Sequence, residues 1–283
     1  MLVNMKDVLQ DAWKNHYAVP AFDCTEDVMI RPILDACEAK RSPVILMALG
    51  HDLRGRGMDY ISSIIKGVAP KYDIPIILHL DHATDIDLIA QAITNGFTSV
   101  MYDGSMLALE TNAANTRKVV KIASGQGVTV EAELGHVAGK ELDGSSAGEM
   151  LLTEPEEVCR FLDDTGVDAL AVSIGTAHGI YTSAPHLNID RLKEIKQRSR
   201  VPLVLHGGSG TPEDQLRQAI LNGIAKVNIY SDLRMSMMNG LKRAADSIRK
   251  PDPLPDILFR PIKEEVENAV ISKINLCMSA GRA

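Results

Sequence analysis

Eight short apolar segments alternate with helix-forming segments along the chain, and this order constrains the fold more than any other feature. The apolar segments are rich in residues that favour strands, and most intervals between them place apolar residues three and four positions apart, as on one helix face. Strands are predicted at 18–22, 44–48, 74–80, 99–102, 128–133, 169–174, 201–205 and 225–229. Helices are predicted at 28–40, 58–71, 86–95, 112–125, 154–165, 189–198 and 212–222.

Strands that alternate with helices are expected to be parallel and joined by right-handed crossovers, and eight is the number that closes a barrel. The predicted fold is therefore a (β/α)8 TIM barrel. The chain has 283 residues, and neither a compositional linker nor a sequence repeat divides it, so we expect a single domain over 1–283. The prolines between Pro251 and Pro261 are expected to break the chain, and an additional C-terminal helix is expected from Ile262 to about Met278.

Composition and charge exclude several classes of protein. With 45% hydrophobic and 24% charged residues the chain is typical of a globular protein. The net charge of −7 gives no general attraction for nucleic acid or anionic lipid. The start of the chain lacks the basic and apolar regions of a signal peptide, and no apolar run has the length of a membrane span, so a cytoplasmic protein is expected. The four cysteines are dispersed and form no Cys-x-x-Cys pair, which argues against a zinc ribbon or a disulfide framework.

Polar side chains collect after the predicted strands, at the end of a barrel that carries catalysis. Histidines follow the third, sixth and seventh strands, and they are His82, His178 and His206. They are able to converge from distant parts of the chain. Three imidazoles with an open fourth position are a typical catalytic Zn²⁺ site, in which the metal polarises a carbonyl. The sequence therefore predicts a zinc site made by these three histidines.

Two candidate turns follow the last two predicted strands, and the first of them is glycine-rich. They are His-Gly-Gly-Ser-Gly at 206–210 and Asn-Ile-Tyr-Ser at 228–231. Barrels often build a phosphate site in these two loops from backbone amides, hydroxyls and a helix N-terminus. An anionic, phosphorylated substrate is the natural inference.

Two loops at the same end carry further candidates. The segment 135–148 is long, glycine-rich and polar, whereas barrel loops usually have about 2 to 6 residues, so a lid is expected there. The segment 50–56 contains Arg54 and Arg56, which are either solvated or close to a distal phosphate or carboxylate of the substrate. His79 stands two residues before Asp81, faces the same side by strand alternation, and is predicted to be hydrogen-bonded in the core.

These motifs resemble those of the class II, zinc-dependent ketose-bisphosphate aldolases, particularly the tagatose/fructose-bisphosphate aldolase branch. The resemblance spans nearly the whole chain. It is carried by the segments 19–22, 78–82, 96–105, 130–135, 174–181, 201–210, 226–229 and 273–277.

The resemblance implies reversible, zinc-dependent aldol cleavage of a ketose 1-phosphate or ketose 1,6-bisphosphate to dihydroxyacetone phosphate and an aldehyde. It implies that the three histidines bind Zn²⁺, and that Asp81 exchanges a proton with the oxygen at the cleaved bond. Glu141, in the long loop, falls where the family places the acid that moves the carbon-bound proton. Asp103 and Glu133 match positions that either engage the metal in alternative placements or orient its histidines.

The resemblance also places residues around the dihydroxyacetone phosphate half and implies partners. The substrate-binding candidates are Gly179, Gly207, Gly208, Ser209, Asn228, Ile229, Tyr230 and Ser231. A monovalent cation, Na⁺ or K⁺, near the phosphate and a homodimer or homotetramer are further implications. The loop with Arg54 and Arg56 does not closely match fructose-bisphosphate motifs, so fructose-type and tagatose-type substrates both stay open.

Two alternatives to an aldolase are retained. A barrel metallohydrolase would use a metal-bound water, but no His-x-His follows the first predicted strand to start such a site. A non-catalytic sugar-phosphate-binding protein would require that the three histidines hold no metal. The aldolase is favoured because the predicted phosphate-binding turns argue against a hydrolase, and Asp81 and Glu141 argue against a non-catalytic protein. Aldol cleavage leaves an enediolate, and a cation held by three neutral ligands would stabilise the developing oxyanion.

Overall fold

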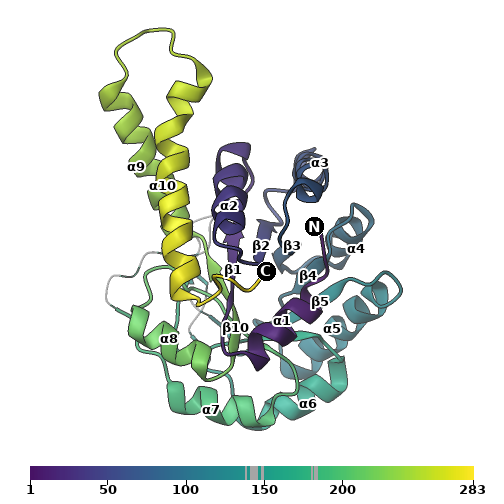
Figure 1. Ribbon diagram of the computed structural model, residues 1–283. Helices are drawn as coiled ribbons and strands as arrows, with labels where there is room; N and C mark the ends of the chain where they lie inside the picture. The colour runs from purple at the N-terminus through teal and green to yellow at the C-terminus, as the bar shows by residue number, and fades with distance from the viewer. Residues whose placement is uncertain (138, 141–145, 148–149, 180, 182–183) are drawn as a thin grey trace.

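The protein is a closed barrel of eight parallel strands (Figure 1). The computed structural model describes residues 1–283 except 138, 141–145, 148–149, 180 and 182–183. Around the barrel the strands follow the order β1-β10-β9-β8-β5-β4-β3-β2, which confirms the predicted (β/α)8 fold. They are β1 (Val19–Asp23), β2 (Val44–Leu49), β3 (Ile76–Ala83), β4 (Ser99–Tyr102), β5 (Thr129–Leu134), β8 (Ala169–Val172), β9 (Leu203–Leu205) and β10 (Ile224–Ile229).

Helices cover the outside of the barrel at the positions that the apolar periodicity predicts, and each lies within a few residues of its predicted bounds. The helices between strands are α2 (Asp27–Ala39), α3 (Gly57–Val68) with the short 3-10 helix η1 (Ala69–Lys71), α4 (Ile86–Thr94), α5 (Leu109–Ala123), α6 (Pro155–Thr165), α7 (Ile189–Arg198) and α8 (Glu213–Leu221). No helix among the described residues is long and apolar enough to cross a membrane. The single domain over 1–283 stays a prediction.

The half of the barrel interior at the amino ends of the strands, here called the lower half, is apolar. It is closed by a helix that the sequence analysis did not predict. This helix, α1 (Met5–Lys14), packs its buried Met5 and Leu9 into one cluster with interior side chains such as Ile45, Ile77 and Val204. Its amphipathic face covers the barrel at the amino ends of the strands, opposite the end where the polar residues gather. The lower interior is therefore a packed core.

The C-terminal region differs from the prediction. A further helix, α9 (Ser231–Ser247), follows β10, and α10 (Pro255–Leu276) begins seven residues before the expected start at Ile262. The predicted break from Pro251 to Pro261 is therefore wrong over its second half. Pro255 occupies the first turn, where its missing N–H costs nothing. Pro261 lies inside α10, where ion pairs and close packing against α9 support the helix.

Helices α9 and α10 form an antiparallel pair that projects well beyond the barrel (Figure 1). We call this pair the arm, residues 231–276. Arg243 of α9 forms ion pairs with Glu264 and Glu265 of α10. Gly240 allows the helices to approach, because a Cβ atom there would lie 2.4 Å from the Cα of Ile262. The arm is thus held together by its own contacts.

Candidate metal centre and active site

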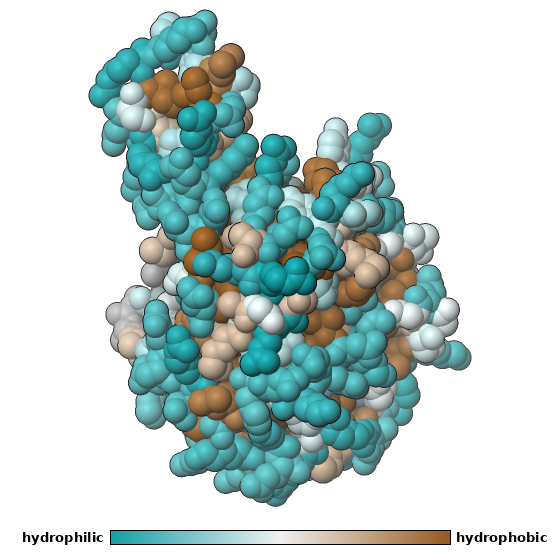
Figure 2. Space-filling view, viewed as in Figure 1, coloured by the Kyte–Doolittle hydropathy of each residue, from teal (hydrophilic) through white to brown (hydrophobic). Residues whose placement is uncertain are grey.

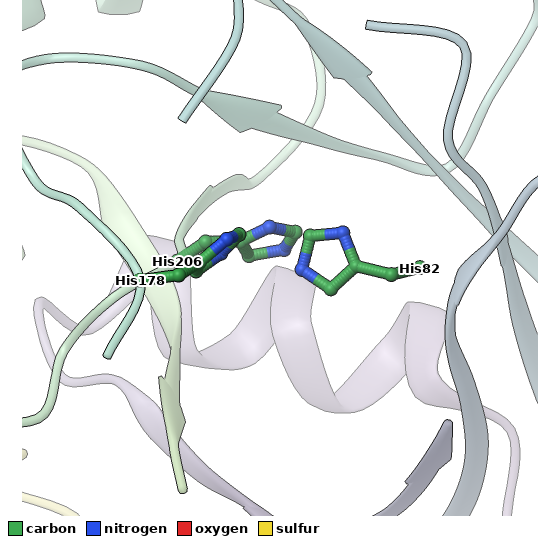
Figure 3. Close-up of side chains that lie close together, drawn as sticks. All are labelled: His82, His178 and His206. Carbon is green, nitrogen blue, oxygen red and sulfur yellow. The ribbon is translucent and has the colours of Figure 1, made fainter. Parts of the chain in front are cut away.

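Three histidines meet at the carboxyl end of the barrel, as the sequence predicts (Figure 3). His82 belongs to β3, while His178 and His206 follow β8 and β9. The ring centroid of His82 lies 4.8 Å from that of His178 and 4.4 Å from that of His206. One ring nitrogen from each residue lies within 4.8 Å of the others, a spacing that a single metal ion is able to bridge.

A bulge in β3 directs two consecutive side chains toward the carboxyl end of the barrel, here called the mouth. In a regular strand Asp81 and His82 would face opposite sides of the sheet. Between Leu80 and Ala83 the pairing with β4 skips one residue, and His82 adopts a positive φ of 46°. A bulge inserts one unpaired residue and redirects side chains, and strained backbone of this kind is often found at functional sites. Both polar groups therefore reach the same site from adjacent positions.

Carboxylates hold the histidine rings in place. His82 Nδ1 lies 2.8 Å from Asp103 Oδ2, and His206 Nε2 lies 3.0 Å from Glu131 Oε1. Such contacts fix the tautomer and orientation of metal-binding imidazoles. The structure also brings a carboxylate oxygen of Asp103 and one of Glu133 within 4.8 Å of a His82 nitrogen, so the alternative metal positions are geometrically available.

The environment of His206 Nδ1 indicates whether the site suits a metal ion. His206 is fully buried, and its Nδ1 makes no hydrogen bond to any described residue. Glu133 Oε2 is 3.0 Å away, but the geometry of a hydrogen bond is not met, and this oxygen also lacks a partner. Buried polar atoms normally have partners, and metal coordination is one way to supply them. A nitrogen left unpaired beside two other imidazoles fits a metal ligand.

Asp81 lies against this site in a strongly polar environment. Its two carboxylate oxygens accept hydrogen bonds from Asn228 Nδ2 at 3.2 and 3.0 Å. Burial by itself raises the pKa of the Asp81 carboxyl, but the positive charge of His82, a hydrogen bond from His79 and the charge of Lys226 lower the pKa well below its usual range. Asp81 is therefore ionised and oriented beside the three histidines.

A buried ion pair beneath the site was missed by the sequence analysis. Lys226 Nζ donates to Glu131 Oε2 at 2.8 Å, and both side chains are fully buried inside the barrel. Burial raises the pKa of the Glu131 carboxyl, whereas the charge of Lys226 and a hydrogen bond from His206 outweigh this and lower the pKa to about 2. His79, predicted to be a hydrogen-bonded core residue, lies 2.8 Å from Ser99 Oγ and 3.4 Å from Lys226 Nζ.

A sequence signal for this ion pair does exist. Polar residues two positions apart occur in three predicted strands or directly after them: His79 and Asp81, Glu131 and Glu133, Lys226 and Asn228. Alternation in a strand points each pair into the barrel, so acids and a base at matching depths must meet. The lower members of these pairs lie away from the strand ends, where the catalytic residues of a barrel are expected.

The two turns predicted to bind phosphate lie next to each other at the start of α9. Ser209 Oγ accepts hydrogen bonds from the backbone amides of Tyr230 and Asp232. Gly207 has a φ of 66°, and a Cβ atom there would lie 2.5 Å from the carbonyl oxygen of Ala177. A side chain is thus excluded from this turn. The structure brings the predicted phosphate-binding segments, 206–210 and 228–231, together at a helix N-terminus.

Other predicted residues have different outcomes. Arg54 and Arg56 are exposed, and within the described part of the chain neither forms an ion pair shorter than 4 Å. Glu141 lies outside the described residues. His136 contacts Ser105, with 3.0 Å between its Nδ1 and Ser105 Oγ.

Three imidazoles and a carboxylate at the catalytic end of a (β/α)8 barrel are typical of an enzyme that uses a metal ion. Residues 3–282 match the family model described as class II fructose-bisphosphate aldolase. The chain therefore belongs to the class II fructose-bisphosphate aldolase family, and it is an aldolase, a carbon–carbon lyase.

Solved structures agree with this assignment. The YdjI aldolase from Escherichia coli K12 is 33% identical, with both chains covered completely and a TM-score of 0.89. A protein provisionally described as a fructose-1,6-biphosphate aldolase from Coccidioides immitis is 30% identical, with 98% of this chain and 96% of that chain covered and a TM-score of 0.86. A fructose-bisphosphate aldolase from Campylobacter jejuni, 20% identical over 100% of this chain and 97% of that chain, shares the fold with a TM-score of 0.84.

Proposed function

We propose that the protein catalyses zinc-dependent, reversible cleavage of a ketose 1-phosphate or ketose 1,6-bisphosphate, of the tagatose or fructose type, to dihydroxyacetone phosphate and an aldehyde. The observation that carries the proposal is the convergence of His82, His178 and His206 beside the ionised carboxylate of Asp81. A Zn²⁺ ion held by these histidines would supply Lewis acidity to the carbonyl and hydroxyl oxygens of the ketose.

Asp81 is the proposed acid and base at the cleaved bond. Its carboxylate takes the proton from the C4 hydroxyl during cleavage and returns it during synthesis. Asn228 holds both oxygens of that carboxylate, and its own Oδ1 is buried without a hydrogen-bond partner among the described residues. Asn228 is therefore able both to orient Asp81 and to accept a hydrogen bond from a substrate hydroxyl.

The remaining roles are assigned by proximity to the two turns and by family resemblance. In this proposal the backbone amides and hydroxyls of these turns bind the phosphate of the dihydroxyacetone half. A Na⁺ or K⁺ ion binds beside that phosphate. Glu141 stays our candidate for moving the carbon-bound proton. The substrate-binding residues of this half are Gly179, Gly207, Gly208, Ser209, Asn228, Ile229, Tyr230 and Ser231.

One measurement tests the reaction without knowledge of the aldehyde. Zinc-loaded and chelator-treated protein are incubated with dihydroxyacetone phosphate in D₂O, and loss of one C3 proton signal is followed by NMR. We expect stereospecific exchange that requires the metal and is restored by adding zinc. Absence of exchange in protein with zinc demonstrably bound would refute the dihydroxyacetone phosphate proposal and favour a hydrolase or a binding protein.

We also propose a homo-oligomer, a dimer or tetramer, that uses the arm. Figure 2 shows apolar side chains at its projecting end. Contiguous exposed apolar surface commonly marks a protein interface, and a second copy is the occupant proposed here. Light scattering after size exclusion should show an oligomer, which Phe259→Asp dissociates. The exposed apolar residues of the arm are Met235, Met238, Leu241, Leu254, Ile257 and Phe259.

A further inference from the structure

Asp23 is a buried carboxyl that the functions assigned so far do not use. It is the last residue of β1, and only 4% of its surface is exposed. Val19 and Ala21 of the same strand belong to the interior cluster, so alternation points Asp23 into the barrel as well. Its Oδ1 has no hydrogen-bond partner among the described residues. A buried carboxyl oxygen without a partner is costly for folding, which calls for an explanation beyond stability.

The register of the strands places Asp23 on the mouth side of the active site. Ala21 pairs with Asn228, and Asp23 is one inward-facing position further toward the mouth. Asn228 in turn donates to both carboxylate oxygens of Asp81. Burial raises the pKa of the Asp23 carboxyl well above its usual range, and the negative charges of Asp81 and Asp52 raise it further, while the positive charges of His82 and Lys226 oppose them. Asp23 therefore favours its neutral form and lies close to Asp81.

Asp52 belongs to the same part of the rim. It follows β2, accepts a hydrogen bond from the backbone amide of Leu49, and lies 3.1 Å from His51 Nε2. The negative charges of Asp23 and Asp52 also raise the pKa of Tyr230, which burial raises most. The rim formed by β1, β2 and the turn after β10 thus presents the carboxyl groups of Asp23 and Asp52 and the phenol of Tyr230, over whose ring Arg234 lies at 5.2 Å.

Within the described part of the chain, the other sides of the mouth already have assigned roles. The turns after β9 and β10 are proposed to hold the phosphate of the dihydroxyacetone half, and the three histidines face its reacting carbons. At the ends of β4 and β5, Asp103 contacts His82, and Ser105 contacts His136. The carbon chain beyond the bond at Asp81 is therefore directed toward the rim with Asp23 and Asp52.

We propose that Asp23 and Asp52 form the subsite for the aldehyde half of the substrate, and that this subsite selects a hydroxylated aldehyde without a phosphate group. This inference rests on the aldolase function proposed above. A carboxyl group is able to accept a hydrogen bond from a sugar hydroxyl, and the unpartnered Oδ1 of Asp23 is available for one. A phosphate dianion at the same place would be repelled by the negative charges of Asp52 and Asp81.

The test compares paired substrates. Retro-aldol kcat/KM is measured for fructose and tagatose 1-phosphates and for the corresponding 1,6-bisphosphates. We expect the wild-type protein to favour a 1-phosphate over its bisphosphate by about tenfold or more, because one charge repulsion at short range reaches this size. Asp23→Asn with Asp52→Asn should reduce this preference, since the double variant removes the charge of Asp52 and the capacity of Asp23 to ionise while keeping polar groups.

A single variant tests the hydrogen bond. Asp23→Ala should lower kcat/KM for the preferred 1-phosphate by roughly 10- to 100-fold, and Asp23→Asn should recover part of the loss. Exchange of dihydroxyacetone phosphate in D₂O should stay within about twofold in both, because that half does not reach the subsite. Zinc content should be unchanged. Asp59→Ala, at an exposed position in α3, is the control for loss of one acidic residue.

Each result has a defined meaning. No exchange by zinc-loaded wild-type protein refutes the aldolase proposal itself. If the wild-type protein exchanges the proton of dihydroxyacetone phosphate but prefers the bisphosphates, only the subsite proposal is overturned. If Asp23→Ala lowers exchange as much as cleavage, Asp23 supports the metal site and the subsite is again refuted. If Asp23→Ala does not fold, the subsite proposal is still tested by two results. These are the wild-type preference between 1-phosphates and bisphosphates and the behaviour of the Asp23→Asn variants.

Discussion

The two halves of the barrel interior are built from the same strands but with opposite chemistry. Strand β3 carries both: Ile77 belongs to the apolar lower cluster, while His79 and Asp81, two and four residues further on, belong to the polar upper half. The lower half is filled by aliphatic side chains and closed by α1. The upper half holds buried charges, a bulge and a positive φ at His82.

This difference separates the sources of stability and function. Burial of an aliphatic side chain stabilises the fold by about 1.5–3 kcal/mol, without any requirement for direction. Buried charges stabilise only when their partners are placed correctly, and the removal of one partner is costly. The lower half therefore supports the strands, and the upper half uses that support to hold unfavourable groups in a reactive arrangement.

The largest expected effect is loss of a metal ligand from the upper half. His178→Ala should reduce the zinc content well below one ion per chain and abolish turnover, because two imidazoles bind zinc far less tightly than three. Zinc is measured by elemental analysis and turnover by coupled detection of dihydroxyacetone phosphate. His186→Ala, at an exposed position in the same loop, is the matched control and should keep both. Full zinc occupancy in His178→Ala would contradict the proposed ligand set.

Removal of Asp81 should separate chemistry from metal binding. Asp81→Ala should keep its zinc and lose about 10²- to 10⁴-fold in kcat, the usual contribution of a positioned acid or base. Steady-state kinetics and zinc analysis check this result. Asp87→Ala, at an exposed position in α4, serves as control. Loss of zinc from Asp81→Ala would instead assign Asp81 to the support of the metal.

The buried ion pair should matter for folding more than any lower-half residue of similar size. Lys226→Met removes the buried cation beside Glu131, leaves that carboxylate with its hydrogen bond to His206, and should cost about 3–5 kcal/mol of unfolding free energy, measured in urea. Lys226→Met combined with Glu131→Gln removes both charges and should recover part of this loss. If the single variant costs less than about 1 kcal/mol, the ion pair does not stabilise the upper half as argued.

The smallest effect is expected from the lower half of the same strand. Ile77→Val removes one buried methylene group and should cost about 0.5–1.5 kcal/mol, with kcat unchanged. Thermal unfolding and steady-state kinetics are the two measurements. A large change in kcat from this substitution would show that the two halves are coupled, and the division drawn above would be wrong.

Local sequence pattern was sufficient for the strands and for most of the site. Eight apolar segments predicted the barrel, because a chain in which strands alternate with helices can adopt only a few topologies. His82, His178 and His206 were predicted because the carboxyl ends of parallel strands share one face. The C-terminal helix was predicted from Ile262, but its first seven residues were missed because Pro255 and Pro261 argue locally against a helix, and contacts between α9 and α10 overcome that preference.

The sequence by itself determined the class of fold, the end of the barrel that carries the chemistry and the residue types gathered there, because these follow from periodicity and chain order. Tertiary structure alone decided that Asp81 and His82 face the same site, since this depends on one unpaired residue between β3 and β4. It also decided that Glu131 meets Lys226 and that Asp23 Oδ1 has no hydrogen-bond partner among the described residues. Those outcomes depend on the register of strands far apart in the chain, which no local pattern specifies.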